Sequence, residues 1–211
     1  MRIINAEFIK GAVKAEQFPD LGVPEFAFFG RSNAGKSSLI NMLVNRKNLV
    51  KTGSRPGMTR EVNFFLVNKP AGAKIGTLKC KKGAEVFGFT DLPGYGYAKI
   101  PGGKIQEIDK MLYEYCTNRP LLKTIFFLMD IRRDPTEVEL NSIHFFYELN
   151  IEVVIVGTKA DKIGKNEQIN VKKTWAKFFN FDESIILFTS TLKKIGREEI
   201  LNFVQKRCIE K

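Results

Sequence analysis

One glycine-rich run carries the clearest chemistry in this sequence. It reads Gly30-Arg31-Ser32-Asn33-Ala34-Gly35-Lys36-Ser37-Ser38 and has the spacing G-x-x-x-x-G-K-[ST] between an apolar and an amphipathic stretch. Its two glycines let the backbone approach a phosphate, and successive N–H groups then point inward at the positive end of a helix dipole. We expect Lys36 to reach the β and γ phosphates and the Ser37 hydroxyl to take a Mg²⁺ position. This context favours a phosphate site over a chance glycine-rich turn.

A second run supplies the chemistry that selects a base. Thr158-Lys159-Ala160-Asp161 follows an apolar stretch and matches [N/T]-K-x-D. The Asp161 carboxylate can accept hydrogen bonds from guanine N1–H and from the exocyclic amine, a donor pair that adenine lacks. The Lys159 stem is expected along the base face. Further on, Thr189-Ser190-Thr191 is a loose version of S-A-x, in which the backbone N–H of Ser190 is expected to meet guanine O6. The predicted guanine-binding residues are Thr158, Lys159, Asp161, Thr189, Ser190 and Thr191.

Two more segments complete the expected triphosphate site. Asp91-Leu92-Pro93-Gly94 ends an apolar stretch, where the carboxylate can hold Mg²⁺ through water and the glycine N–H can meet the γ-phosphate. Taken alone, this segment is equally well a structural turn. Upstream, Thr59 is the expected switch threonine. Five such elements in this order predict a guanine-nucleotide-binding protein that hydrolyses GTP. The predicted catalytic residues are Lys36, Thr59 and Gly94, and the predicted Mg²⁺ ligands are Ser37, Thr59 and Asp91.

Short apolar stretches alternate with amphipathic stretches along the chain. The predicted strands are 25–30, 62–67, 85–90, 123–130, 151–157 and 184–188, and the predicted helices are 36–45, 104–118, 135–149, 166–179 and 197–208. Continuous apolar strands indicate a sheet covered on both faces, so we expect a three-layer α/β fold with a mostly parallel sheet. Together with the phosphate and guanine motifs, this pattern predicts a P-loop G domain. One strand is expected to be antiparallel, because a basic connection at 69–83 joins two strands without a helix. We expect a single domain over 1–211, with an additional edge strand at 3–9.

The charge balance favours a polyanionic partner. There are 34 Lys and Arg residues against 23 Asp and Glu residues, which gives a formal net charge of +11. Seven basic residues and no acidic one lie within 26–60, and five lysines lie between 62 and 84. We therefore expect the excess on or near the switch segments, facing nucleic acid or an anionic membrane. A solvated face with no specific partner is the alternative.

Several function classes are disfavoured. Three cysteines without close spacing predict neither a disulfide framework nor a metal site and indicate a reducing compartment. The single histidine, His144, excludes a histidine-dependent triad and a multi-histidine metal site. No apolar run approaches the roughly 20 residues of a membrane-spanning helix. We expect a cytoplasmic monomer that does not act on membranes.

These motifs resemble those of the EngB (YihA/YsxC) family of bacterial ribosome-assembly GTP-binding proteins. The resemblance covers most of the chain, and Asp91-Leu92-Pro93-Gly94-Tyr95-Gly96-Tyr97-Ala98-Lys99 is its most specific part. It implies a Ras-like fold, GTP and Mg²⁺ binding, and a role in maturing the large ribosomal subunit, with that subunit or its rRNA as partner. The connection 69–83 is long for the family, and Thr191 varies its loosest motif. The other matching segments are 30–38, Ser54-Arg55-Pro56-Gly57-Met58-Thr59, Met129-Asp130-Ile131-Arg132, 158–161 and Lys193-Lys194.

Hydrolysis is expected by in-line attack of water on the γ-phosphate, with catalysis by positioning and charge neutralisation. Tyr95 stands where Ras-like enzymes place a water-orienting glutamine, and a phenol cannot replace an amide that both donates and accepts. Slow intrinsic hydrolysis follows, unless another group supplies what the glutamine would, or Tyr95 itself positions the water. Asn33 is a candidate K⁺ ligand, because GTPases with asparagine at this position of the P-loop often bind K⁺ between the phosphates.

Two other classes stay open. A P-loop kinase is disfavoured by Asp161 and by the lack of any motif for an acceptor substrate. A regulatory GTPase could instead act on a protein or membrane partner, for example in cell division or septation, without direct ribosome binding.

Overall fold

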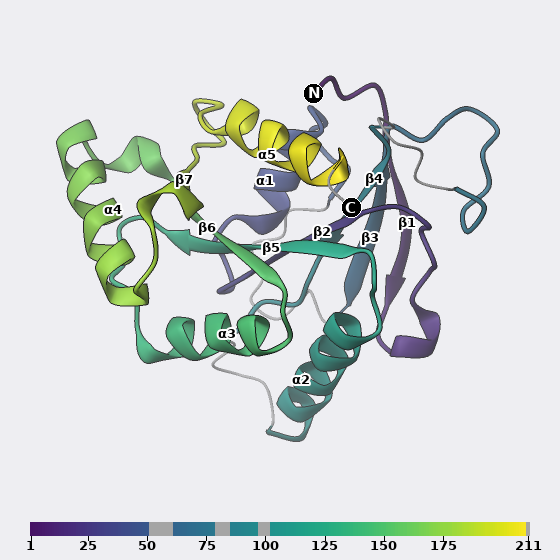
Figure 1. Ribbon diagram of the computed structural model, residues 1–211, viewed down its shortest axis with the longest axis horizontal. Coiled ribbons are helices and arrows are strands. Elements are labelled where there is room, and N and C mark those ends of the chain that lie inside the picture. Colours follow the sequence, from purple (N-terminus) through teal and green to yellow (C-terminus); the bar gives the residue numbers. More distant parts are fainter. Residues whose placement is uncertain (51–60, 79–84, 97–101, 210–211) are drawn as a thin grey trace.

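The computed structural model describes residues 1–50, 61–78, 85–96 and 102–209, which build a seven-stranded sheet flanked by helices (Figure 1). The predicted strands and helices are confirmed, and their ends shift by at most three residues. In the part of the chain that is described, no helix has the length and apolar character needed to cross a bilayer. The strands are β1 (Ala6–Ala12), β2 (Glu25–Gly30), β3 (Val62–Val67), β4 (Phe87–Asp91), β5 (Leu122–Asp130), β6 (Glu152–Thr158) and β7 (Ile186–Phe188). The helices are α1 (Lys36–Leu43), α2 (Gly102–Thr117), α3 (Glu137–Glu148), α4 (Lys165–Phe179) and α5 (Arg197–Ile209), with 3-10 turns η1 (Ala15–Gln17), η2 (Ala160–Lys162) and η3 (Glu183–Ile185).

The strand order is β1-β3-β4-β2-β5-β6-β7. β2 is parallel to β4 and β5, and β6 is parallel to β5 and β7, whereas β3 is antiparallel to both β1 and β4. The expected mostly parallel sheet with one antiparallel strand is therefore confirmed. β1 is the predicted edge strand, although it begins three residues later than the predicted start at Ile3. Its pairing shifts between Phe8 and Lys10, where one extra residue bulges from the strand.

Strand direction decides where the charged loops lie. β2 and β4 are parallel, so that their carboxyl ends, Gly30 and Asp91, lie at one edge of the sheet. β3 runs the opposite way, and Val67 at its end pairs with Phe87 at the start of β4. The loop that begins after β3, with Lys69, therefore lies at the opposite edge (right in Figure 1). The prediction that this basic connection lies near the switches is wrong for its described residues, because β3 carries the chain away from that edge.

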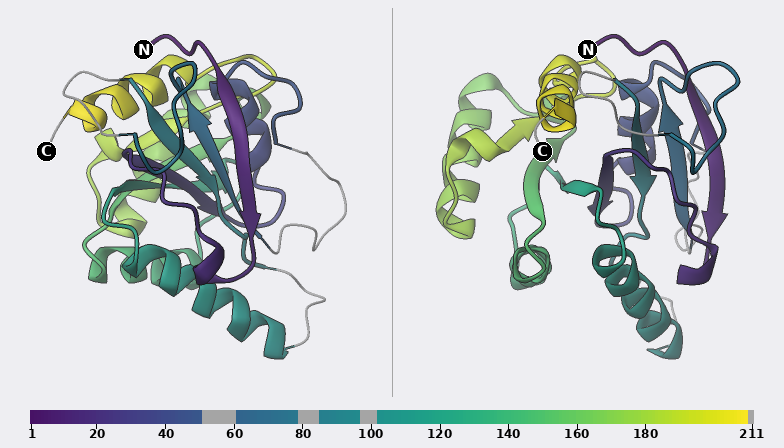
Figure 2. Two further views of the ribbon diagram at one scale, coloured as in Figure 1. Left: turned by 90° about the vertical axis from the view of Figure 1, so that its right-hand side faces the viewer. Right: turned by 45° about the vertical axis from the view of Figure 1, so that its right-hand side comes forward.

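The core has two parts, one on each face of the sheet. Successive residues of β2 alternate between them, because neighbouring side chains of a strand point to opposite faces. Phe26 and Phe28 belong to the cluster that includes α1 and α5, whereas Ala27 and Phe29 belong to the cluster that includes α2, α3 and α4. Figure 2 shows the resulting arrangement, with α1 and α5 on one side of the sheet and α2 and α3 on the other. The three-layer prediction is confirmed.

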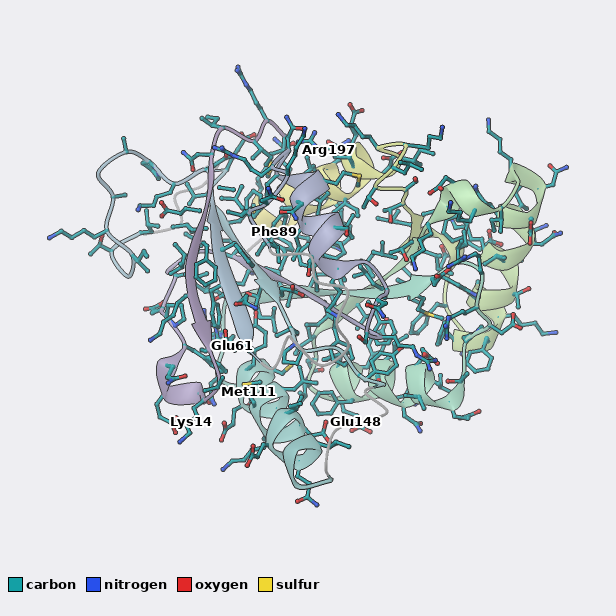
Figure 3. All side chains as sticks on the ribbon, turned by 180° about the vertical axis from the view of Figure 1, so that it is seen from behind. Lys14, Glu61, Phe89, Met111, Glu148 and Arg197 are labelled. Atoms are coloured by element: carbon teal, nitrogen blue, oxygen red, sulfur yellow. The ribbon has the colours of Figure 1, made fainter. Side chains whose placement is uncertain are left out.

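The helix after the glycine-rich run is short and is capped by a distant residue. α1 ends at Leu43, before the predicted end at Asn45, whose φ of 53° is left-handed. Arg197, at the start of α5, donates from Nε to the Met42 carbonyl at 3.0 Å and from Nη2 to the Leu43 carbonyl at 2.8 Å. Figure 3 shows Arg197 beside α1. These bonds satisfy carbonyls that the helix end leaves open, and they fix α1 against α5.

A buried ion pair stabilises the opposite end of the sheet. Arg119 Nη2 donates to Glu25 Oε1 at 2.5 Å, with side-chain exposures of 9% and 3%. Burial raises the pKa of Glu25, and the charge of Arg119 opposes that rise. Arg119 also donates to the Pro19 carbonyl at 2.7 Å and lies over the rings of Phe64 and Tyr115. Arg119, which follows α2, thus bonds both to the start of β2 and to the segment before it.

Candidate nucleotide site

The glycine-rich run turns sharply at the end of β2. Gly30 has a φ of 151°, and a Cβ there would lie 2.3 Å from the Leu128 carbonyl oxygen, so a side chain does not fit. Asn33, with a φ of 65°, and Gly35, with a φ of 99°, adopt left-handed conformations. Gly35 is also the N-cap of α1 and has no side chain that could cap the helix. The first N–H groups of α1 are therefore available to an anion at the positive end of the helix dipole.

Thr158 fixes the run from the side of β6. Its side chain is 5% exposed, and Oγ1 lies 2.7 Å from the Ala34 carbonyl oxygen and 3.1 Å from the Met129 carbonyl oxygen. In a trans peptide the C=O and the following N–H point in opposite directions. Holding the Ala34 carbonyl on Thr158 therefore turns the Gly35 N–H toward the other side of the loop. The hydroxyl of Thr158 holds the loop and is not directed at a base.

Lys36, Ser37 and Asp91 come together as predicted. Lys36 is 8% exposed and donates from Nζ to the Gly30 carbonyl at 3.3 Å. Ser37 Oγ donates to Asp91 Oδ2 at 3.0 Å, whereas the buried Oδ1 has no hydrogen-bond partner among the described residues. Burial lowers the pKa of Lys36 and raises the pKa of Asp91, and the attraction between the two opposes both shifts. A hydroxyl and a carboxylate with a spare oxygen fit the preference of Mg²⁺ for hard oxygen ligands.

The turn after β4 lies directly on the glycine-rich run. A Cβ on Gly94 would be 2.6 Å from the Gly30 carbonyl oxygen and 2.8 Å from Lys36 Nζ. The Ser32 N–H donates to the Tyr95 carbonyl at 3.0 Å, so the P-loop and this turn are joined through their backbones. The N–H of Ser32, one of the predicted phosphate-binding residues, is therefore already engaged. Arg31 and Asn33 are exposed, Ala34 is buried, and Ser38 lies in the first turn of α1.

A bond to α3 holds the side chain of Tyr95 away from the P-loop. Its ring lies against Phe29 and Phe127, with centroids 5.6 Å and 6.1 Å away. Its hydroxyl donates to Glu139 Oε1 at 2.6 Å, and burial together with Glu139 raises the pKa of Tyr95 far above its ordinary value. The other oxygen of Glu139 accepts from the Thr136 N–H at 2.9 Å and caps α3. In this conformation the phenol is committed to α3, which does not support its expected alternative role as a water-positioning group.

The base-selecting loops meet at Asp161. Ser190 Oγ donates to Asp161 Oδ1 at 2.5 Å, and this bond is the main cause of the lowered pKa of Asp161. The Ser190 N–H, predicted from the sequence to meet guanine O6, instead donates to the Ile195 carbonyl at 3.1 Å. That assignment is corrected, because Ser190 and Ile195 form an isolated antiparallel bridge. Thr189 is fully buried, and its N–H donates to the Gly157 carbonyl at 2.7 Å. Thr191 is exposed, and its N–H has no partner among the described residues.

Two acidic residues of the site were not predicted from the sequence. Asp130, at the end of β5, accepts from Lys159 Nζ at 2.8 Å, and Glu139 accepts from Tyr95. Asp130 could have been found, because it ends the strand next to β6 and carboxyl ends of parallel strands meet at one edge. Glu139 lies on a helix 44 residues after Tyr95, and no local signal joins the two. Thr59, the predicted switch threonine, lies outside the described residues.

The loops after β2, β4 and β6 thus converge on one edge of a Ras-like sheet, with a phosphate loop, a carboxylate for Mg²⁺ and a base-selecting carboxylate. This fold and site define a P-loop GTPase. The sequence profile of a family described as 50S ribosome-binding GTPase matches residues 25–159. The probable GTP-binding protein EngB of Treponema denticola is 72% identical over 212 residues, which covers 98% of this chain and all of that protein. The chain belongs to the EngB family, as the motifs predict.

Solved structures show the same fold. A crystal structure of a probable GTP-binding protein engB aligns with a TM-score of 0.65 over 89% of this chain and 100% of that chain, at 22% identity. A crystal structure of Era in complex with MgGDPNP and a segment of 16S ribosomal RNA aligns with a TM-score of 0.63 over 90% of this chain and 58% of that chain, at 23% identity. The predicted Ras-like fold class is confirmed.

The position of Tyr95 leads to a testable prediction. Tyr95→Phe removes the hydroxyl bonded to Glu139 but keeps the ring contacts, so we expect GTP turnover to stay within about twofold of the wild type. The free energy of unfolding should fall by about 1–2 kcal/mol, because a buried carboxylate loses a donor. Phosphate release and urea denaturation measure the two quantities, with Tyr113→Phe, at an exposed tyrosine, as the control. A large loss of turnover with unchanged stability would show that the phenol acts at the phosphate.

Proposed function

We propose that this chain binds GTP with Mg²⁺, hydrolyses it to GDP and phosphate, and changes conformation between the two nucleotides. The observation that supports this best is the 2.5 Å hydrogen bond from Ser190 Oγ to Asp161 Oδ1. An ionised carboxylate has about four acceptor sites, and this bond uses one of them while orienting the group. Asp161 can therefore still accept from the N1–H and the exocyclic amine of guanine. Adenine would leave this charge without donors, which accounts for a guanine preference.

The proposed base contacts follow from which groups are already engaged. Because the Ser190 N–H donates within its own loop, the adjacent Thr191 N–H is the proposed donor to guanine O6. Lys159 covers one face of the base with its methylene stem, since its Nζ is held at the Asn33 carbonyl 3.2 Å away. Thr158 and Thr189 act indirectly, by fixing the loops that carry these groups.

The phosphates are proposed to bind the N–H groups of the P-loop. The available donors lie at Asn33 and at residues 35–37, and Lys36 supplies a buried positive charge that burial makes more effective. Ser37 and Asp91, joined with Thr59 when GTP is bound, would hold Mg²⁺. When bound, the metal ion neutralises charge on the phosphate oxygens. The Gly94 N–H is the proposed contact to the γ-phosphate, and a side chain at that position would collide with Lys36.

Hydrolysis is proposed to proceed by attack of water in line with the leaving group, with Lys36, Thr59 and Gly94 as the catalytic residues. Among the described residues, no amide side chain replaces the water-orienting glutamine of Ras-like enzymes, because Tyr95 stands at that position and its hydroxyl is bonded to Glu139. Slow intrinsic turnover follows from this. The Asn33 side chain is exposed and makes no hydrogen bond to the described residues, so its amide oxygen is the proposed K⁺ ligand.

Base selection is tested by substituting Asp161. For Asp161→Ala we expect GTP affinity to fall by at least about a hundredfold, because two charge-assisted hydrogen bonds are lost, while ATP affinity stays low and unchanged. Isothermal titration calorimetry of both nucleotides measures this. Asp182→Ala removes an exposed aspartate that only caps η3 and should leave the preference intact. Equal affinities of the wild-type protein for GTP and ATP would contradict the proposal.

The proposed K⁺ role is tested by comparing turnover in buffers of equal ionic strength. We expect GTP hydrolysis to be about tenfold faster in K⁺ than in Na⁺, because a cation between the phosphates stabilises developing negative charge. Asn33→Ala should abolish this difference, whereas Asn48→Ala, at another exposed asparagine, should preserve it. Identical turnover of the wild type in K⁺ and Na⁺ would remove this role.

The finer function that we propose is assistance to assembly of the large ribosomal subunit, in the cytoplasm. The matching family profile is described as a 50S ribosome-binding GTPase, and Era, which shares the fold, has been crystallised with ribosomal RNA. The charge supports a nucleic-acid partner, and the nucleotide edge exposes the cations Arg132, Lys162, Lys193 and Lys194. The alternative is a regulatory GTPase in cell division, for which a protein partner would not need this charge, whereas an anionic membrane would also attract it.

Cosedimentation with 50S subunits tests the ribosomal proposal. We expect binding to be at least about tenfold stronger with a nonhydrolysable GTP analogue than with GDP, and to weaken steeply as salt increases. The double substitution Lys193→Glu/Lys194→Glu should abolish binding. The matched double substitution Lys74→Glu/Lys206→Glu reverses the same charge at two exposed lysines of the opposite edge and should leave binding largely intact. Absence of binding in every nucleotide state would favour the alternative function.

A further inference from the structure

A carboxylate at the end of β5 is bonded to the lysine of the base-selecting loop. Asp130 pairs in register with Thr158, so Lys159 follows directly on the neighbouring strand. Asp130 Oδ2 accepts from Lys159 Nζ at 2.8 Å, and the same ammonium group donates to the Asn33 carbonyl at 3.2 Å. Lys159 therefore bridges β5 and the P-loop through one group.

Arg132 orients this carboxylate from its other side. It donates to Asp130 Oδ1 from its backbone N–H at 3.2 Å and from Nε at 2.9 Å, and to Oδ2 from Nη2 at 2.6 Å. The Asp130 side chain is only 8% exposed. The hydrogen bonds from Arg132 outweigh the effect of burial, and with those from Lys159 they hold the pKa of Asp130 well below its ordinary value. Asp130 is therefore a fixed negative charge at neutral pH.

These bonds restrict the conformational freedom of the Lys159 side chain. The Lys159 side chain is 36% exposed, and an unpaired lysine of that exposure would sample many rotamers. Its backbone is left-handed, with a φ of 60°, and its Nζ lies at the Asn33 carbonyl of the P-loop. With Nζ held by Asp130, the stem lies in place before any nucleotide arrives, and the Asn33 carbonyl is held with it. Binding then does not have to order these groups.

We propose that Asp130 is a positioning residue for guanine nucleotides, which acts by fixing Lys159 across the P-loop. This rests on the proposed nucleotide site, because Lys159 is taken to cover the base. Asp130 itself does not touch the nucleotide, and it neither donates to nor accepts from the base. Loss of the Asp130 carboxylate should therefore weaken the binding of every nucleotide whose base packs against the Lys159 stem, whichever groups the edge of the purine carries.

The test is the rate at which nucleotide dissociates from Asp130→Asn. We expect release of a fluorescent GDP to be about tenfold faster, since Lys159 loses its charged partner. Fluorescent IDP, which lacks the exocyclic amine read by Asp161, should be released faster by the same factor. Arg133→Ala is the matched control and should not change either rate, because the exposed Arg133 contacts Asp130 only through its backbone N–H, which donates to the Asp130 carbonyl at 2.9 Å and is kept in the variant.

A double-mutant cycle separates positioning from a general structural role. Lys159→Met keeps the stem but removes the ammonium group, and we expect the variant with both substitutions to release GDP no faster than Lys159→Met alone. Additive effects, or a lowered melting temperature with an unchanged release rate, would overturn the proposal. Should Asp130→Asn fail to fold, Arg132→Ala replaces it, with a smaller acceleration expected and an unchanged rate again counting against the proposal.

The outcome for the wild type distinguishes two failures. A wild-type protein that holds GDP in preference to ADP, combined with unchanged release from Asp130→Asn, would overturn the role of Asp130 alone. A wild-type protein without that preference would overturn the proposed nucleotide site itself.

Discussion

The buried hydrogen bond from Thr158 Oγ1 to the Ala34 carbonyl, at 2.7 Å, sets the direction in which the phosphate loop presents the Gly35 N–H. The two glycines of the loop have no side chains that could fix the neighbouring peptides, and the left-handed φ of 65° at Asn33 is costly to hold. The orientation of the loop's N–H groups must therefore come from outside. Thr158 fixes this orientation from β6, which is two strands away from β2 in the sheet. Because Lys159 and Asp161 follow Thr158 directly, the same bond couples the phosphate loop to the base-selecting loop.

Two charged residues, Lys36 and Asp91, are buried at the P-loop. Lys36 and Asp91 are almost completely buried, and burial shifts the pKa of each toward its neutral form. A protein with no anion to bind would gain little from keeping such groups in its interior. Here each reduces the cost of the other, and Asp91 keeps one oxygen without a partner among the described residues. A buried ammonium group and a carboxylate oxygen therefore lie where a triphosphate and a metal ion would bind.

The turn after β4 is attached to two different parts of the molecule. Its backbone is bonded to the P-loop through Ser32, whereas the side chain of Tyr95 is bonded to α3 through Glu139. Glu139 divides its oxygens between the cap of α3 and the phenol, so the helix start and the turn share one charged group. A rearrangement of this turn would have to break contacts with α3, which offers a physical route from the phosphate site to a distant surface.

Much of this protein could be read from its sequence, because the relevant signals are local. Apolar stretches alternating with amphipathic ones are sufficient for the three-layer fold, and the spacing of Gly30, Gly35 and Lys36 is sufficient for a phosphate loop. Tertiary structure alone decided which polar and charged groups contact one another. The direction of β3 placed Lys69 at the far edge, the bridge to Ile195 engaged the Ser190 N–H, and strand register brought Asp130 to Lys159. Such pairings join residues far apart in the chain, so residue spacing along the sequence does not contain them.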